Sequence, residues 1–67
     1  METIIYRNIR KIRIEKNFTQ EYMAEEMSIS QTYYSKIERG EKDITLSQIV
    51  KITKIFNIDT ETLFEQK

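Results

Sequence analysis

Hydrophobic residues recur along this chain three and four positions apart, the spacing that places side chains on one face of a helix. Ile5, Ile9 and Ile12 follow this rule and predict a first helix from about Thr3 to Lys16. The same reasoning predicts four further helices, at about 20–27, 31–39 and 46–56, and a short last one that follows Asp59 and holds Leu63 and Phe64.

Polar capping residues mark where these helices begin and end, because the chain contains no Pro and a single Gly. Thr45 and Gln48 form a capping-box pattern, in which each side chain bonds the backbone amide of the other residue. The other residues expected at N-caps are Thr19, Ser30 and Asp59. The residues expected to end a helix in the left-handed conformation are Asn17, Gly40 and Asn57.

Residues 19–40 read as two short amphipathic helices joined by a tight turn, which is the sequence form of a helix-turn-helix. This motif places its second helix in the major groove of DNA. The second helix here would show a polar face with Gln31, Thr32 and Lys36. The side chains expected to face inward are Met23, Ala24, Met27, Ile29, Tyr34 and Ile37.

The fourth helix continues the core, and a short polar loop at 41–44 is expected to precede it. Its apolar face is expected to hold Leu46, Ile49, Ile52, Thr53 and Phe56. Three further apolar residues, Ile14, Val50 and Ile55, fall off the main apolar stripes.

Composition excludes several classes of site. The chain of 67 residues is one domain, and without Cys or His it lacks disulfides, thiolate metal sites and the commonest metal ligand. Its carboxylates fall on solvent-facing helix positions, so no enzyme, metal or cofactor is expected. No apolar run approaches the ~20 residues that span a bilayer, and no secretory signal is present, so a cytoplasmic protein without membrane contact is expected.

The 11 basic and 11 acidic residues cancel, which is unusual for a nucleic-acid binder. Any basic surface must therefore be local, and DNA affinity should be modest and strongly salt-dependent. Basic residues gather in two places. The first run, which reads equally well as ordinary solvated helix surface, is Arg7, Arg10, Lys11, Arg13 and Lys16, and the second group is Lys36, Arg39 and Lys42.

From about Ile5 to Phe64, the ordered set of apolar and capping residues resembles the Cro/repressor-type helix-turn-helix family of phage and bacterial transcription regulators. The resemblance implies an all-α, compact five-helix, lambda-repressor-like DNA-binding domain over 1–67, with its motif at about 19–40 and double-stranded DNA as partner. The residues that carry it are Ile9, Ile12, Arg13, Thr19, Gln20, Met23, Ala24, Ile29, Ser30, Tyr33 to Gly40, Leu46, Ile49, Ile52, Ile58, Leu63 and Phe64.

The resemblance also implies residue roles. Gln31, Thr32 and Lys36 fall where family members read bases: Gln can bind adenine, Lys can reach guanine, and the Thr methyl can touch thymine. Arg13 and Glu38 match a pair that forms an inter-helix salt bridge in relatives. The residues expected at the DNA backbone are Gln20, Arg10, Tyr33, Ser35, Arg39, Lys42 and Thr45, although Tyr33 could instead only fill space.

One position departs from the family pattern. Ser28 stands where the turn usually holds Gly. If Ser28 takes a positive φ, a strain of roughly 1 kcal/mol is expected, because its side chain then approaches a carbonyl oxygen.

The resemblance implies a homodimer on a (pseudo)palindromic operator, with half-sites about one helical turn apart. Chains of this size resemble phage repressors, restriction–modification controller proteins, or antitoxins that repress their own operon. Zero net charge motivates the alternative of a protein-interaction module with weak or no DNA binding. The residues expected at the dimer interface are Val50, Ile55, Ile58, Leu63 and Phe64.

Overall fold

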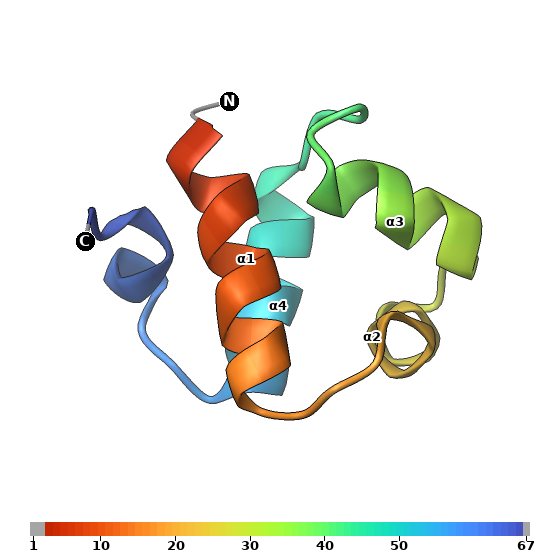
Figure 1. Cartoon of the computed structure of the whole chain (residues 1–67), viewed down its shortest axis with the longest axis horizontal. Coiled ribbons are helices and arrows are strands. Elements are labelled where there is room, and N and C mark those ends of the chain that lie inside the picture. Colours follow the sequence, from red (N-terminus) through yellow and green to blue (C-terminus); the bar gives the residue numbers. More distant parts are fainter. Residues whose placement is uncertain (1–2, 67) are drawn as a thin grey trace.

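Five helical segments follow one another through the described part of the chain, residues 3–66 of this computed structural model (Figure 1). In Figure 1, α1 crosses in front of α4, with α2 and α3 on one side and η1 on the other. The all-α prediction is confirmed. The segments are α1 (Thr3–Glu15), α2 (Gln20–Met27), α3 (Gln31–Glu38), α4 (Leu46–Phe56) and the 3₁₀ helix η1 (Thr60–Phe64).

The last segment differs from the expected fifth α-helix. Asp59 has extended backbone angles at its start but makes no side-chain capping bond. Five residues without an N-cap hydrogen bond give little support to an α-helix, and short helical runs commonly take the tighter 3₁₀ form. The count is therefore four α-helices and one 3₁₀ helix within residues 3–66.

Side-chain caps start the three inner helices, as the sequence predicts. The hydroxyls of Thr19 and Ser30 accept hydrogen bonds from the amides three residues on, at 2.9 and 3.0 Å. At α4 the capping box is complete: the Gln48 amide donates to Thr45 Oγ1 at 3.1 Å, and the Thr45 amide donates to Gln48 Oε1 at 3.0 Å. Each helix therefore begins where its own sequence specifies.

The helix ends use left-handed residues, also as expected. Asn17, Ser28 and Asn57 have φ values of 62°, 59° and 58°, and Gly40 has 77°. A Cβ added to Gly40 would lie 3.5 Å from the Tyr6 ring, an ordinary contact, so the φ rather than space favours glycine there. Ser28 therefore adopts the conformation in which strain was expected.

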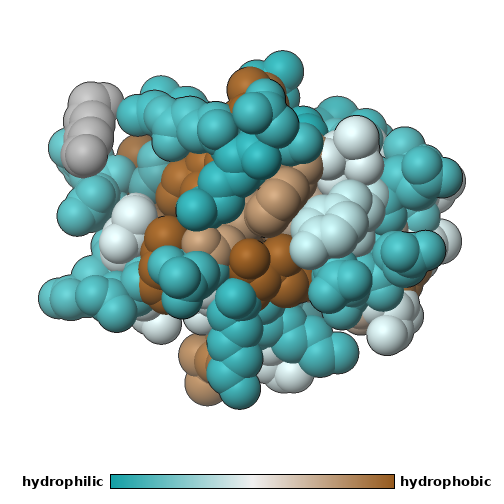
Figure 2. Space-filling view, turned by 90° about the horizontal axis from the view of Figure 1, so that it is seen from below, coloured by the Kyte–Doolittle hydropathy of each residue, from teal (hydrophilic) through white to brown (hydrophobic). Residues whose placement is uncertain are grey.

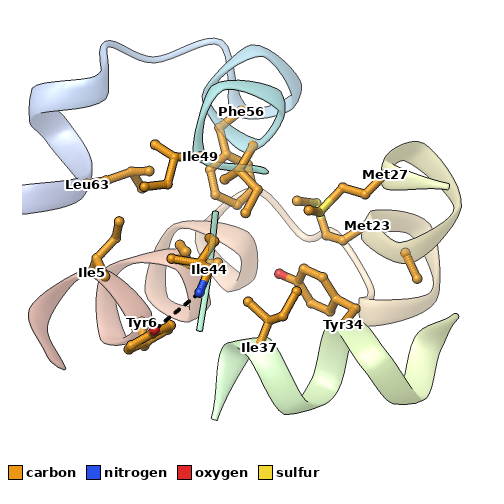
Figure 3. Close-up of a cluster of buried hydrophobic side chains, with 13 residues drawn as sticks. Ile5, Tyr6, Met23, Met27, Tyr34, Ile37, Ile44, Ile49, Phe56 and Leu63 are labelled. Atoms are coloured by element: carbon orange, nitrogen blue, oxygen red, sulfur yellow. Dashed lines mark hydrogen bonds between the residues drawn. The ribbon is translucent and has the colours of Figure 1, made fainter. Parts of the chain in front are cut away.

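The core lies where side chains from all five segments meet (Figure 3). Asn8 fastens the last segment to α1: its Nδ2 donates to the carbonyl oxygens of Leu63 and Glu65, both at 2.8 Å. The large side chains that are fully buried are Tyr34, Phe56, Ile5, Ile9, Met23, Ile37, Ile52 and Leu63.

Two expectations about α4 and the loop before it are wrong. Leu46 is 74% exposed, because it is the first residue of α4 and side chains there point back toward the helix start, past the packed turns. Ile44, placed in a polar loop by the sequence, is 4% exposed. Its amide donates to the hydroxyl of Tyr6 at 3.4 Å, so Ile44 ties the loop to α1.

Candidate nucleic-acid interface

An open groove runs between the start of α2 and the outer face of α3. It brings together residues that the sequence placed at base and backbone contacts, and all of them are polar. Its lining offers amides, hydroxyls and one guanidinium, groups that can bond base edges and phosphate oxygens. The lining residues are Gln20, Gln31, Thr32, Ser35 and Arg39.

The outer face of α3 presents the three expected base readers. Gln31 and Thr32 are exposed in its first turn, and Lys36 is half-buried one turn later. On the inner face, Tyr34 and Ile37 are fully buried. Because the inner side chains hold α3 against the core, the orientation of its polar face is set by packing rather than by flexible loops.

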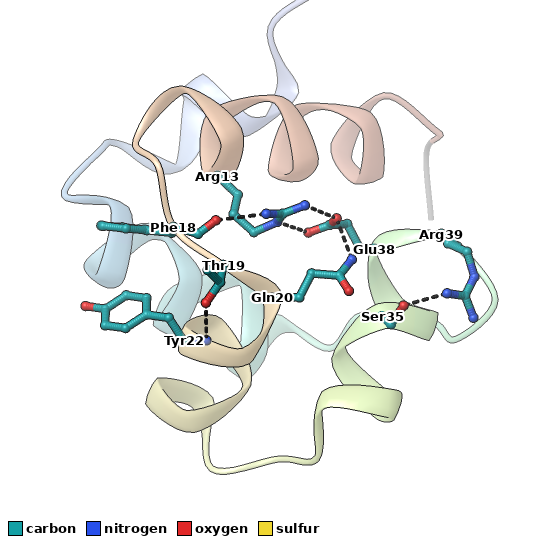
Figure 4. Close-up of polar contacts among 8 residues, drawn as sticks. All are labelled: Arg13, Phe18, Thr19, Gln20, Tyr22, Ser35, Glu38 and Arg39. Carbon is teal, nitrogen blue, oxygen red and sulfur yellow. Dashed lines mark hydrogen bonds and ion pairs between the residues drawn. The ribbon is translucent and has the colours of Figure 1, made fainter.

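Gln20 lies at the groove and also belongs to a polar cluster beneath it (Figure 4). Arg13 Nε donates to Glu38 Oε2 at 2.8 Å, and Arg13 Nη2 donates to Glu38 Oε1 at 2.9 Å. Gln20 Nε2 donates to the same Glu38 Oε1 at 3.0 Å, and Arg13 Nη1 to the Phe18 carbonyl at 2.8 Å. The expected Arg13–Glu38 salt bridge is present, and it fixes the side chain of Gln20 as well.

Glu38 is charged although its side chain is only 1% exposed. Burial alone would raise the pKa of this carboxyl, but the hydrogen bonds from Arg13 and Gln20 outweigh burial and hold its pKa below the usual value. The same pairing raises the pKa of Arg13. The cluster thus connects α1, α2 and α3 through one carboxylate.

The Tyr33 ring is half-buried and packs against the core. Lys42 Nζ lies 5.9 Å from the centre of that ring, within the range of a cation–π contact. The ring of Tyr33 therefore places the Lys42 ammonium beside the C-terminal half of the motif.

Arg39 reaches the groove from the end of α3, and its guanidinium is already engaged. Nε donates to Glu41 Oε2 at 2.7 Å, Nη2 to Glu41 Oε1 at 3.3 Å, and Nη1 to the Ser35 hydroxyl (Figure 4 draws the Ser35 bond). The hydrogen bond to Glu41 raises the pKa of Arg39 and lowers that of Glu41. Sequence reasoning missed Glu41; the only signal was an acid two residues from an expected phosphate contact.

Four expected backbone contacts lie outside the groove lining: Arg10, Tyr33, Lys42 and Thr45. The Thr45 amide is occupied by the capping box, which leaves the hydrogen of its hydroxyl and the neighbouring amides at the start of α4. Arg10 is exposed on α1 and lines no part of the groove.

The expected dimer residues divide by burial. Val50 and Phe64 are each 42% exposed, whereas Ile55 and Ile58 are half-buried against the core. Leu63 is fully buried inside the protein, so the prediction that it lies at a dimer interface is wrong. The helical period gives the direction of a side chain but not whether another segment already covers it. On the face drawn in Figure 2, hydrophobic side chains are exposed among hydrophilic ones.

Neither a metal centre nor a membrane span is evident in residues 3–66. No group of three acidic, His or Cys side chains there is arranged to hold a metal ion. No helix of that part is long and apolar enough to cross a membrane.

Known proteins resemble this chain over most of its length. A family model described as Helix-turn-helix matches residues 9–63, which include all of α2, α3 and α4. Control protein C.BamHI of Bacillus amyloliquefaciens is 38% identical over 58 residues, covering 85% of this chain and 72% of that protein. Control protein C.SmaI of Serratia marcescens is 30% identical over 67 residues, covering 100% and 80%. Control protein C.MunI of Mycoplasma sp is 35% identical over 57 residues, covering 84% and 77%.

Proposed function

We propose that this chain, which belongs to the helix-turn-helix family of DNA-binding transcription regulators, binds a (pseudo)palindromic operator as a homodimer. The similarity to control proteins, which extends over most of their length, supports the role of a restriction–modification controller. The observation that carries the proposal is the polar groove formed by the start of α2 and the outer face of α3.

In this proposal α3 enters the major groove and its first turn reads base edges. The Gln31 amide bonds N6 and N7 of adenine, and the Thr32 methyl contacts a thymine methyl. Lys36, one turn further, reaches O6 or N7 of guanine. Exposure of Gln31 and Thr32, together with the firm anchoring of the opposite face, supports these roles.

The DNA backbone is held from both ends of the motif. Gln20 and the free amides at the start of α2 bind one phosphate, where the helix dipole favours an anion. Arg39, Lys42 and the Thr45 hydroxyl bind phosphates beyond the end of α3. These contacts orient the protein on the duplex without reading sequence, and Ser35, Tyr33 and Arg10 add to them.

Dimerisation uses the exposed apolar surface of α4 and η1, centred on Val50 and Phe64, with the half-buried Ile55 and Ile58 beside it. A two-fold dimer presents two α3 helices to half-sites about one helical turn apart, so the operator is expected to be palindromic.

Selection of bound duplexes from a random pool tests this function directly. The protein should enrich a palindromic sequence at low salt, and binding should weaken steeply as salt rises. Recovery of no preferred sequence would contradict it and favour the protein-interaction module.

A pair of variants then separates base reading from backbone contact. Gln31→Ala should cost about 1–3 kcal/mol on the selected site and relax preference at one base pair in each half-site. Lys42→Ala should weaken all duplexes evenly and reduce the salt slope by about 1. Equal weakening of every sequence by Gln31→Ala would remove Gln31 from the base contacts.

A further inference from the structure

We propose that Glu41 is an intramolecular competitor of DNA: its carboxylate occupies the edge of the Arg39 guanidinium that a phosphate would take. This inference rests on the proposed function, because it concerns how tightly the same groove holds the DNA backbone.

The geometry of the pair carries the argument. Glu41 bonds Nε and Nη2 of Arg39 with its two oxygens, at 2.7 and 3.3 Å. A phosphate recognised by arginine uses the same two parallel donors, since its oxygens are spaced like those of a carboxylate. Ser35 takes a third donor, on Nη1. Only the tip of the guanidinium, with one hydrogen on each terminal nitrogen, remains open.

The charges of the pair explain why Glu41 should weaken DNA binding rather than strengthen it. The side chains of Arg39 and Glu41 are 52% and 53% exposed, so the pair sits in water-rich surroundings at the groove. The Arg39–Glu41 pair itself presents no net charge to a phosphate. An incoming phosphate must displace the carboxylate or approach it closely, and either event weakens backbone binding.

Asp43 provides a matched control, because Glu41→Gln and Asp43→Asn remove the same charge from the same loop. Asp43 is exposed and forms no ion pair with any residue in 3–66. A general charge effect would act from both positions, whereas competition for Arg39 acts only from Glu41.

The test measures the affinity of the intact protein for a duplex of random sequence, of about 20 base pairs, across a salt series. Glu41→Gln and Glu41→Ala should tighten binding about two- to five-fold at low salt, the scale expected for an exposed ion pair. The slope of log affinity against log salt should steepen by up to about 0.9, which corresponds to one further neutralised phosphate. Asp43→Asn should change both quantities less.

The Arg39→Ala background completes the design. There, Glu41→Gln should have no more effect than Asp43→Asn, because the competed group is gone. Equal effects of Glu41→Gln and Asp43→Asn in both backgrounds would overturn the competition. Weaker binding by Glu41→Gln would overturn it too, since the carboxylate would then be orienting Arg39 for DNA. If neither the parent protein nor Glu41→Gln binds any duplex at low salt, the DNA-binding function itself fails.

Discussion

Ser28 and Ser30, which flank Ile29 in the turn of the motif, are expected to have opposite effects on stability. Ser28 holds φ at 59°, where a non-glycine residue is strained by about 1–2 kcal/mol, whereas Ser30 caps α3 through its hydroxyl. Ser28→Gly should relieve that strain but lose about 0.4–1 kcal/mol to the greater freedom of the unfolded chain. The net expectation is a gain of about 0.5 kcal/mol in the free energy of unfolding, measured by urea denaturation.

Ser30→Ala is the comparison variant, and it should lose about 1 kcal/mol because an amide of α3 loses its acceptor. If Ser28→Gly destabilised the protein as much as Ser30→Ala does, the left-handed turn would be held by the Ser28 side chain rather than strained by it.

Glu38 is the residue on which three helices depend, so its removal should be costly. Glu38→Gln leaves Arg13 with a reduced partner in a site where the arginine side chain is 12% exposed. The expected loss at neutral pH is about 3 kcal/mol, the lower end for breaking a buried pair, because Arg13 keeps some water contact. Replacing both Arg13 and Glu38 by Leu should cost less than the single change, because no unpaired charge stays behind.

The same carboxylate makes stability depend on pH. Its pKa is lower in the folded protein than in the unfolded chain, so it stabilises the fold above the unfolded value of about 4.3. That stabilisation is lost as pH falls through the folded pKa, because the unfolded chain takes up the proton first. Urea denaturation at pH 7 and pH 3 should therefore show the parent protein and Glu38→Gln converging at the lower pH. A constant difference between the two would contradict the pairing.

At the scale of elements, the helix positions could be predicted because the inner helices begin at capping residues that lie within the same short stretch of sequence. Thr19, Ser30 and Thr45 bond amides only three residues away, and such local bonds are visible in the sequence. Burial at the ends of elements could not be predicted in the same way. Leu46 and Ile44 lie two residues apart, and which of them is covered depends on Tyr6 and other residues distant in sequence.

The same distinction between predictable and unpredictable features applies to the candidate site. The exposed polar face of α3 could be predicted, since helical period alone places Gln31 and Thr32 on the side away from Tyr34 and Ile37. The bonds of Gln20 to Glu38 and of Arg39 to Glu41 could not, because they depend on side-chain conformations that no spacing rule fixes.

The attachment of η1 to α1 depends on Asn8, which no sequence pattern singled out. Its side-chain amide donates two bonds of 2.8 Å to carbonyl oxygens of the C-terminal segment. Asn8→Ala should lower the free energy of unfolding by about 1–2 kcal/mol and increase hydrogen exchange in residues 60–66 more than elsewhere. Arg7→Ala, an exposed change on α1 outside the cavity that Asn8 lines with Thr62 and Glu65, is the control. Uniform exchange changes in the Asn8 variant would show that the bonds do not hold η1 in particular.

For the whole molecule, zero net charge and DNA binding are compatible because the charges are unevenly placed. The groove lining holds one cation, Arg39, which is paired with Glu41 just outside the lining, while exposed acidic residues such as Glu25, Glu26 and Asp59 do not line the groove. Local cations then act on phosphates within a screening distance of about 8 Å, beyond which opposite charges elsewhere contribute little. In the proposed complex one chain makes few phosphate contacts and would hold DNA weakly, so a second copy on the same duplex would add a second set of contacts.

The proposed dimer surface is therefore the feature of the whole molecule that most needs a test. Val50 is 42% exposed on α4, where a partner would cover it, so Val50→Lys should raise the dimer dissociation constant about tenfold or more by burying a charge. Ile14→Lys is the matched control: Ile14 is 47% exposed, but it lies on α1, outside the proposed interface. Analytical ultracentrifugation, with and without the selected duplex, should show Val50→Lys as a monomer under conditions where the parent protein and Ile14→Lys are dimers.

The affinity of Val50→Lys for the operator should also fall, whereas the contacts that one chain makes with a single half-site should persist. A parent protein that stays monomeric at high micromolar concentration, even on DNA, would exclude the dimer, and equal effects of the two lysines would place the interface elsewhere.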